Sequence, residues 1–294
     1  MKSIFRGVCP ALVTPFKNND IDIESLKVLI QKQLNENADA ICILGTTGEA
    51  STITDSERKK IITTTIKCVD KKCKVIVGCG TNDFEKTKRY ILQAKKLGAN
   101  AALVVTPYYN KTTQNGLYNY YQKLCEIGLP IIAYNVPSRT GMNIDFVTLK
   151  KLSKLKNIFG IKESSSDINR IINVCKICSG KMPVYSGEDN LNYIFYMLGA
   201  NGAISVTANL YCKKVKEIFD LVSKQKIKKA VKLQFNLDRV NESLFLETNP
   251  IPIKALLAEK GYIKNELRLP LEKMSKGSKK IMLKNIKKYE EKMR

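Results

Sequence analysis

The sequence predicts an α/β fold, a single (β/α)8 TIM barrel with a helical C-terminal extension. Two observations support this prediction. Short apolar runs alternate with longer segments of helical periodicity, and about eight such pairs precede residue 220, which is the strand number of a closed barrel. The chain has 294 residues, of which 44% are hydrophobic, and this is enough for one large buried core.

The predicted strands are short, apolar on both faces, and followed by Gly, Thr, Pro, Asn or Ser. Runs of this kind are typical of parallel strands that helices cover on one side and a barrel interior fills on the other. They occupy residues 7–13, 38–44, 74–77, 101–105, 131–134, 158–161, 184–186 and 202–206.

The segments between these runs have the spacing of amphipathic helices. In the first of them, Leu26, Leu29, Ile30 and Leu34 fall on one side. In the second, Thr54 is followed three residues later by Glu57, the pattern of a capping box. The predicted helices cover residues 23–34, 55–69, 83–97, 116–127, 145–155, 166–178 and 189–198.

The last part of the chain is predicted to be almost wholly helical, with helices at 210–225, 228–246, 253–259 and 278–293. Pro250 and Pro252 mark a break between two of them. No low-complexity linker separates this part from the strands. We therefore expect a barrel over residues 1–220 and a helical extension packed on it over 221–294. The alternative fold is an open doubly wound sheet.

The composition excludes several kinds of chemistry and leaves one question about partners. The chain has no histidine, so histidine cannot serve as a general base, a triad member or a metal ligand. The net charge of +23 can indicate nucleic acid, an anionic membrane surface or an anionic substrate. Aromatic residues are not interleaved with the basic ones, however, so we expect no nucleic-acid partner and interpret the charge as a solvated surface.

Cysteine usage and hydropathy indicate the compartment. Nine cysteines, an odd number, occur without a secretory signal, and no stretch approaches the roughly 18 apolar residues of a membrane span. We therefore expect a soluble cytoplasmic protein with reduced thiols and no membrane association. A zinc site made by Cys175, Cys178, Cys68 and Cys73 is an alternative that requires two distant segments to meet.

Polar residues follow the predicted strands, where function collects in a barrel. Lys162 ends the apolar run 158–161, so its stem emerges into the barrel mouth. Desolvation disfavours the ammonium form and gives a neutral amine that can attack a carbonyl group. A solvated lysine at a strand end is the alternative for any single lysine in so lysine-rich a chain. Placement inside a barrel favours a Schiff-base lyase or aldolase.

The neighbouring strand ends supply hydroxyls and one guanidinium. The segment Gly45-Thr46-Thr47-Gly48-Glu49 lacks the spacing of a P-loop, but its backbone and hydroxyl donors suit a carboxylate. Tyr109 and Tyr134 either pack in the core or form a hydroxyl relay with Thr46 that moves protons without histidine. Arg139 is either a salt-bridge residue or a fork for a substrate carboxylate.

Together these motifs resemble the dihydrodipicolinate synthase/N-acetylneuraminate lyase family of pyruvate-using class I barrels. The resemblance covers almost the whole chain, including residues 11–16, 248–254 and 267–270. The segments 45–49 and 134–141, the latter with Arg139, resemble the synthase branch of the family. The sialic-acid lyase branch typically has Ser at the position of Thr46 and lacks that arginine.

The resemblance implies the roles of four catalytic residues. Lys162 forms an imine with pyruvate, with no cofactor and no metal, and the enamine derived from it attacks aspartate 4-semialdehyde. The product is 4-hydroxy-tetrahydrodipicolinate, formed in the first committed step of lysine and diaminopimelate biosynthesis. Tyr134 moves protons together with Thr46 and Tyr109, and Tyr109 reaches in from the neighbouring subunit of a homotetramer built as a dimer of dimers.

The resemblance also implies four substrate-binding residues. Thr47 helps Thr46 to hold the pyruvate carboxylate, Arg139 binds the carboxylate of the semialdehyde, and Gly187 and Ile204 line the pyruvate pocket. The closest alternative is another pyruvate-dependent aldolase of this family, a sialic-acid or 2-keto-3-deoxy-sugar lyase.

Lysine-inhibited members of the family have an inhibitor site beside Tyr108 at the dimer interface. The matching positions of this chain carry Ala50, Ser51, Asp55, Arg58, Asn82 and Lys86. Arg58 and Lys86 place positive charge where a cationic ligand would bind. We therefore expect feedback inhibition by lysine to be weak or absent.

Overall fold

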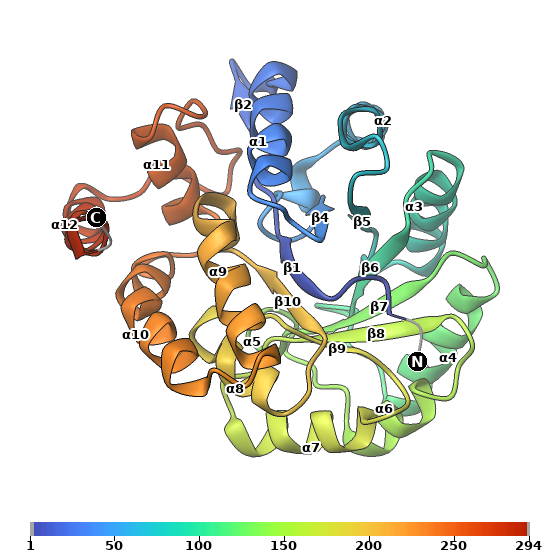
Figure 1. Ribbon diagram of the computed structural model, residues 1–294. Coiled ribbons are helices and arrows are strands. Elements are labelled where there is room, and N and C mark those ends of the chain that lie inside the picture. The colour runs from blue at the N-terminus through green and yellow to red at the C-terminus, as the bar shows by residue number, and fades with distance from the viewer. Residues whose placement is uncertain (1–2, 293–294) are drawn as a thin grey trace.

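The computed structural model describes residues 3–292, and its eight parallel strands form a closed barrel ringed by helices (Figure 1). Neighbouring strands pair in the order β1-β10-β9-β8-β7-β6-β5-β4. The ring closes between the first and last of these, where Ala11 bridges Cys42 and the Leu12 amide donates to the Cys42 carbonyl at 2.8 Å. The predicted TIM barrel is confirmed, and the open sheet is wrong. The strands are β1 (Gly7–Pro10), β4 (Ala40–Ile43), β5 (Lys74–Gly78), β6 (Ala101–Val105), β7 (Ile131–Asn135), β8 (Ile158–Glu163), β9 (Val184–Ser186) and β10 (Gly202–Ser205).

The helices that cover the barrel lie close to the predicted segments. The capping box of Thr54 and Glu57 is formed at the start of α2 (Asp55–Val69). The predicted helix 189–198 is instead a short 3-10 helix, η2 (Asp189–Leu191), followed by α8 (Asn192–Met197). The other covering elements are α1 (Ile23–Asn35), η1 (Ala50–Thr52), α2 (Asp55–Val69), α3 (Phe84–Lys96), α4 (Gln114–Cys125), α5 (Pro137–Thr140), α6 (Phe146–Leu152), α7 (Ile168–Cys178) and α9 (Ala208–Ser223).

A small hairpin was not predicted. It joins β2 (Phe16–Lys17) and β3 (Asp20–Ile21) in antiparallel pairing, and its turn residues Asn18 and Asn19 have φ values of 54° and 63°. Asparagine adopts this left-handed region more readily than other non-glycine residues, so an Asn-Asn pair suits a two-residue hairpin turn.

The apolar residues form two separate cores, as the alternation of strand side chains requires. One core fills the barrel interior, with Cys9, Cys42, Leu103, Tyr185 and Ile204 among its members. The other lies between the strands and the covering helices. Side chains at the carboxyl ends of the strands therefore pack against the filled barrel interior, which restricts their movement.

The C-terminal helices α10 (Ile227–Ser243), α11 (Ile251–Glu259) and α12 (Lys276–Lys292) lie side by side on one flank of the barrel (Figure 1). The predicted division after residue 220 falls near the end of α9 and stays a prediction. Met293, the predicted end of the last helix, lies outside the described residues. The connections on either side of α11 return to the barrel mouth, where Asn249, Pro250, Pro270 and Leu271 border a cavity.

Arg268 anchors the connection after α11 to the start of α2. Its guanidinium donates to both carboxylate oxygens of Glu57, to the Thr52 carbonyl at 2.8 Å and to the Asn19 carbonyl at 2.6 Å. The hydrogen bonds from Arg268 lower the pKa of Glu57 from 4.5 to about 2. Since both side chains are less than one-fifth exposed, this pair stabilises the fold.

We predict that Glu57→Gln removes about 2 kcal/mol of unfolding free energy at neutral pH. Because the folded-state pKa of Glu57 is depressed, its contribution is complete above the unfolded value of 4.5 and is lost as the pH falls toward about 2. The difference between wild type and variant is therefore constant above about pH 5.5 and smaller by about 1 kcal/mol near pH 3.5. Urea unfolding at both pH values measures it. A difference that is the same at both would contradict the assignment.

Candidate active site

Two adjoining cavities open at the carboxyl ends of the barrel strands. The inner one, of about 170 Å³, lies over the barrel interior. The outer one, of about 350 Å³, lies toward α2 and α3. Five of the predicted side chains line the inner cavity together with the backbone of Gly187; they are Thr46, Thr47, Tyr134, Arg139 and Lys162. Thr46, Tyr134 and Arg139 line both cavities and therefore stand between them.

Lys162 lines the inner cavity. It lies on β8 in register with Tyr134 on β7, is only 7% exposed, and holds its Nζ 4.3 Å from the centroid of the Tyr134 ring. Among residues 3–292, no carboxylate lies within ion-pair distance of this amine. The Lys162 amine is therefore not held in an ion pair, and it lines a cavity in which it can meet a carbonyl group.

Two thiols form the floor beneath the lysine. Burial raises the pKa of Cys42 to about 11 and that of Cys9 well above its usual range. Both thiols are therefore neutral near pH 7 and supply no charge to the amine.

The loop that carries Thr46 and Thr47 is a tight turn after β4. The Gly48 amide donates to the Gly45 carbonyl at 3.0 Å, and Thr47 Oγ1 accepts from Asn249 Nδ2 at 2.9 Å. Thr47 is buried, whereas Thr46 is partly exposed. The turn presents hydroxyl and amide donors to the inner cavity, which suits a carboxylate.

Glu49, the last residue of that motif, is a structural residue. Its carboxylate pairs with Lys254 of α11 at 2.6 Å and accepts from the Arg268 backbone amide at 3.1 Å. The side chains of Glu49 and Lys254 are almost completely buried, and burial lowers the pKa of Lys254 against the opposing effect of Glu49. This pair fastens the C-terminal segment to the threonine loop.

Arg139 lies in α5, the short helix that Pro137 begins after β7. One guanidinium nitrogen donates to the Asn249 carbonyl at 2.7 Å. Asn249 thus contacts both Thr47 and Arg139, and the sequence interpretation did not single it out. Asn249 lies 202 residues after Thr47 in the chain, so no local sequence pattern indicates that the two residues are in contact.

Gly187 gives the lysine stem its room. A Cβ atom at this position would lie 2.7 Å from Lys162 Cε and 2.0 Å from Ser164 Oγ. Any side chain here would displace the amine.

Ile204 lies deeper in the barrel core, where it is 1% exposed, and its side chain borders neither cavity. Its predicted place in the pyruvate pocket stays a prediction.

Tyr109 does not reach the site within one chain. Its side chain is 94% exposed, its φ is +70°, and it borders neither cavity. Its neighbour Tyr108 does line the outer cavity. The predicted relay of Tyr134, Thr46 and Tyr109 is therefore not formed by a single subunit.

The cysteines do not form the alternative zinc site. Within residues 3–292, no three His, Cys, Asp or Glu side chains are placed to hold a metal ion together. All nine cysteines are free thiols, and seven of them are buried. None of the helices within residues 3–292 is long and apolar enough to cross a membrane.

The closed barrel with a lysine-centred pocket at its mouth defines the chain as a TIM-barrel enzyme. The chain belongs to the dihydrodipicolinate synthetase family, whose model matches residues 4–289. It is 45% identical over 273 residues to the 4-hydroxy-tetrahydrodipicolinate synthase of Thermotoga neapolitana, covering 91% of this chain and 93% of that one.

Two solved structures are similar to the fold. The dihydrodipicolinate synthase of Thermotoga maritima has a TM-score of 0.96 and 42% identity, with 98% of this chain and 99% of that chain covered. The chloride-inhibited dihydrodipicolinate synthase of Acinetobacter baumannii, complexed with pyruvate, has a TM-score of 0.95 and 37% identity, with 97% and 99% covered.

Proposed function

We propose that the protein is a class I lyase that condenses pyruvate with L-aspartate 4-semialdehyde to give 4-hydroxy-tetrahydrodipicolinate. The observation that carries the proposal is the buried Lys162 amine, 4.3 Å from the Tyr134 ring and without a carboxylate partner, inside a cavity rimmed by two threonines and an arginine. The name of the Thermotoga neapolitana relative supports the same reaction.

In the first half-reaction the neutral amine of Lys162 attacks the ketone carbon of pyruvate. The carbonyl oxygen leaves as water after two protonations, and an imine to Lys162 forms. The donors of Thr46 and Thr47 hold the pyruvate carboxylate, and the Tyr134 hydroxyl transfers the protons. This assignment needs no histidine, and the chain has none.

In the second half-reaction the imine loses a methyl proton and becomes an enamine, whose carbon attacks the aldehyde of the semialdehyde. The amino group of the second substrate then attacks the imine carbon, closes the ring and releases Lys162 as a free amine. Arg139 binds the carboxylate of the semialdehyde, which is a charge-assisted contact for a planar guanidinium. No external cofactor takes part.

We further propose that a neighbouring subunit supplies Tyr109, in a homotetramer built as a dimer of dimers. The 94% exposure of this tyrosine and its left-handed φ support a role outside its own subunit. The outer cavity beside Tyr134 and Thr46 offers the space. We place the enzyme in the cytoplasm, which the nine free thiols support.

The reaction is tested by a coupled assay that offers pyruvate with either aspartate 4-semialdehyde or a sugar aldehyde. We expect turnover with the semialdehyde and rates lower by at least about 100-fold with sugar aldehydes, because Arg139 matches a carboxylate. Preference for a sugar aldehyde would identify the protein as another pyruvate-dependent aldolase of the family.

We predict that lysine inhibits the enzyme weakly or not at all. Arg58 and Lys86 line the outer cavity, and their charges lie 3.8 Å and 5.7 Å from the Tyr90 ring centroid. Arg58 is 1% exposed and donates to the Gly78 carbonyl at 2.8 Å, so it cannot swing away easily. Titration of the activity with L-lysine measures this. Half-inhibition in the low-to-middle micromolar range would refute it.

A further inference from the structure

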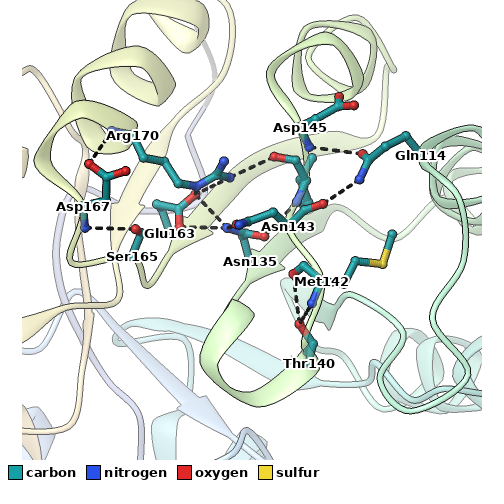
Figure 2. Close-up of polar contacts among 11 residues, drawn as sticks. Gln114, Asn135, Thr140, Met142, Asn143, Asp145, Glu163, Ser165, Asp167 and Arg170 are labelled. Carbon is teal, nitrogen blue, oxygen red and sulfur yellow. Dashed lines mark hydrogen bonds and ion pairs between the residues drawn. The ribbon is translucent and has the colours of Figure 1, made fainter.

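A buried polar cluster that includes Asn135, Glu163 and Arg170 (Figure 2) begins at the residues that follow Tyr134 and Lys162 in the chain. Strand side chains alternate, so the residues after Tyr134 and Lys162 point away from the barrel interior. These residues are Asn135 and Glu163, which pair in register and are both 0% exposed. A carboxylate buried completely between the strands and the covering helices needs partners that offset its desolvation.

Glu163 is bound from two sides. Asn135 Nδ2 donates to its two carboxylate oxygens at 2.9 and 3.1 Å. Arg170 of α7 donates through Nε and Nη2 to Oε2 at 3.1 and 3.0 Å. Burial raises the pKa of Glu163, and the Arg170 charge and these hydrogen bonds oppose that effect. The carboxylate thus joins the ends of β7 and β8 to the first turns of α7.

The same cluster holds the loop that follows Arg139. Asn135 Oδ1 accepts from the Ile144 amide at 3.0 Å, and its Nδ2 donates to Asn143 Oδ1 at 3.0 Å. Gln114 of α4 donates to the Asn143 carbonyl at 2.7 Å (Figure 2). The segment that contains Arg139 is therefore tied to the residues adjacent to Tyr134 and Lys162.

The pairing of β7 with β8 is irregular below this point. Ile131 pairs with Ile158, but Ile132 pairs with Gly160, so one residue of β8 is passed over. A bulge of this kind changes the direction in which the side chains after it point. Regular strand pairing alone therefore does not determine the orientation of the side chains at the ends of β7 and β8. The contact of Asn135 with Glu163 comes after the bulge, beside Tyr134 and Lys162.

We propose that Glu163, held by Asn135 and Arg170, is a positioning residue that fixes the Lys162 amine against Tyr134 and links both to the Arg139 segment. The inference rests on the proposed Schiff-base function. None of the three lines either cavity, so they act through their neighbours and not on the substrate. The inference does not change the proposed substrate, which is a 2-oxo acid that forms an imine with Lys162.

Glu163→Gln tests the inference with little change in volume. An amide offers one oxygen, so its NH2 group must face either Asn135 Nδ2 or Arg170, both of which are donors. We expect the rate constant for pyruvate-dependent borohydride trapping, and kcat, to fall by about 10-fold or more. The KM for pyruvate is expected to change by less than about 3-fold, because the groups that hold the carboxylate remain.

A second variant guards against simple misfolding. The double substitution of Glu163→Leu with Arg170→Met replaces a buried ion pair by apolar groups, an exchange that proteins often tolerate. The double variant is expected to keep the thermal unfolding midpoint of the wild type and to trap pyruvate as slowly as Glu163→Gln does.

Asp39→Asn is the matched control, because Asp39 pairs with Lys216 at 2.6 Å before the start of β4, at the opposite end of the barrel. It is expected to trap at the wild-type rate below its unfolding temperature.

The outcomes separate the two proposals. Slow trapping in both Glu163 variants, with wild-type trapping in Asp39→Asn, supports the positioning role. Wild-type trapping rates in Glu163→Gln, while the wild-type protein is trapped normally, overturn the inference and leave the proposed function standing. An equal loss in Asp39→Asn overturns it as well, since the effect would then follow stability alone. Failure of the wild-type protein to trap pyruvate refutes the proposed function itself.

Discussion

Lys162→Ala is expected to lower kcat with pyruvate and aspartate 4-semialdehyde by at least about 10⁴-fold. The reason is chemical, since the substitution removes the amine that forms the covalent bond and no other lysine lines the inner cavity. Lys86 lines the outer cavity but not the inner one, and so cannot replace it. Steady-state assays with freshly purified variant measure the loss.

The fold is expected to survive this substitution. Lys162 makes no ion pair among the residues described, and it is 7% exposed, so its removal relieves the cost of a buried amine. Lys162→Met, which keeps the length of the stem, is expected to be as inactive and at least as stable to heat. Lys181→Ala, on the exposed turn after α7, is the lysine control and should have wild-type activity. Residual activity within about 100-fold of wild type in Lys162→Met would contradict the Schiff-base assignment.

Arg139→Ala is expected to lower kcat/KM for the semialdehyde by about 10²–10³-fold. The guanidinium borders both cavities and is fixed by its bond to the Asn249 carbonyl, so it meets a substrate carboxylate in a prepared orientation. The loss comes from the charge-assisted bonds to the second substrate. Stopped-flow or coupled kinetics over a range of semialdehyde concentrations separate kcat from KM.

The same variant should leave the first half-reaction nearly intact. Pyruvate trapping on Lys162 is expected within about 3-fold of wild type, because Thr46 and Thr47 hold that carboxylate. Arg139→Lys keeps the charge without the planar fork and should fall between wild type and Arg139→Ala. An equal loss of pyruvate trapping would show that Arg139 acts on the first substrate and would contradict its assigned role.

Most of the barrel was predictable because its signal is local. Each strand is a short run buried on both faces, and each helix keeps its apolar side within one segment. The exceptions have local causes too. Two positive-φ residues, Asn18 and Asn19, make a hairpin out of a stretch too short for a periodic pattern. A 3-10 turn at Asp189–Leu191 precedes α8 because the Asp189 carboxylate accepts from the amides of Val206 and Thr207.

The site was predictable only where a motif ends a strand. Lys162, Tyr134, Thr46, Thr47, Arg139 and Gly187 follow apolar runs, so the topology of the barrel brings them together. Asn249 and Lys254 reach the threonine loop across more than 200 residues of chain. Contacts between residues so far apart in the chain cannot be predicted from the spacing of residues within one segment. Tyr109 shows a further limit, since its predicted role requires a second subunit.

Trapping of pyruvate on the protein tests the central claim most directly. The wild-type chain is incubated with pyruvate and borohydride, and the adduct is located by peptide mass mapping. The account predicts one reduced pyruvate adduct per chain, on Lys162, and none without pyruvate or in Lys162→Ala. Folded protein that gives no adduct, or gives it on a different lysine, would contradict the account.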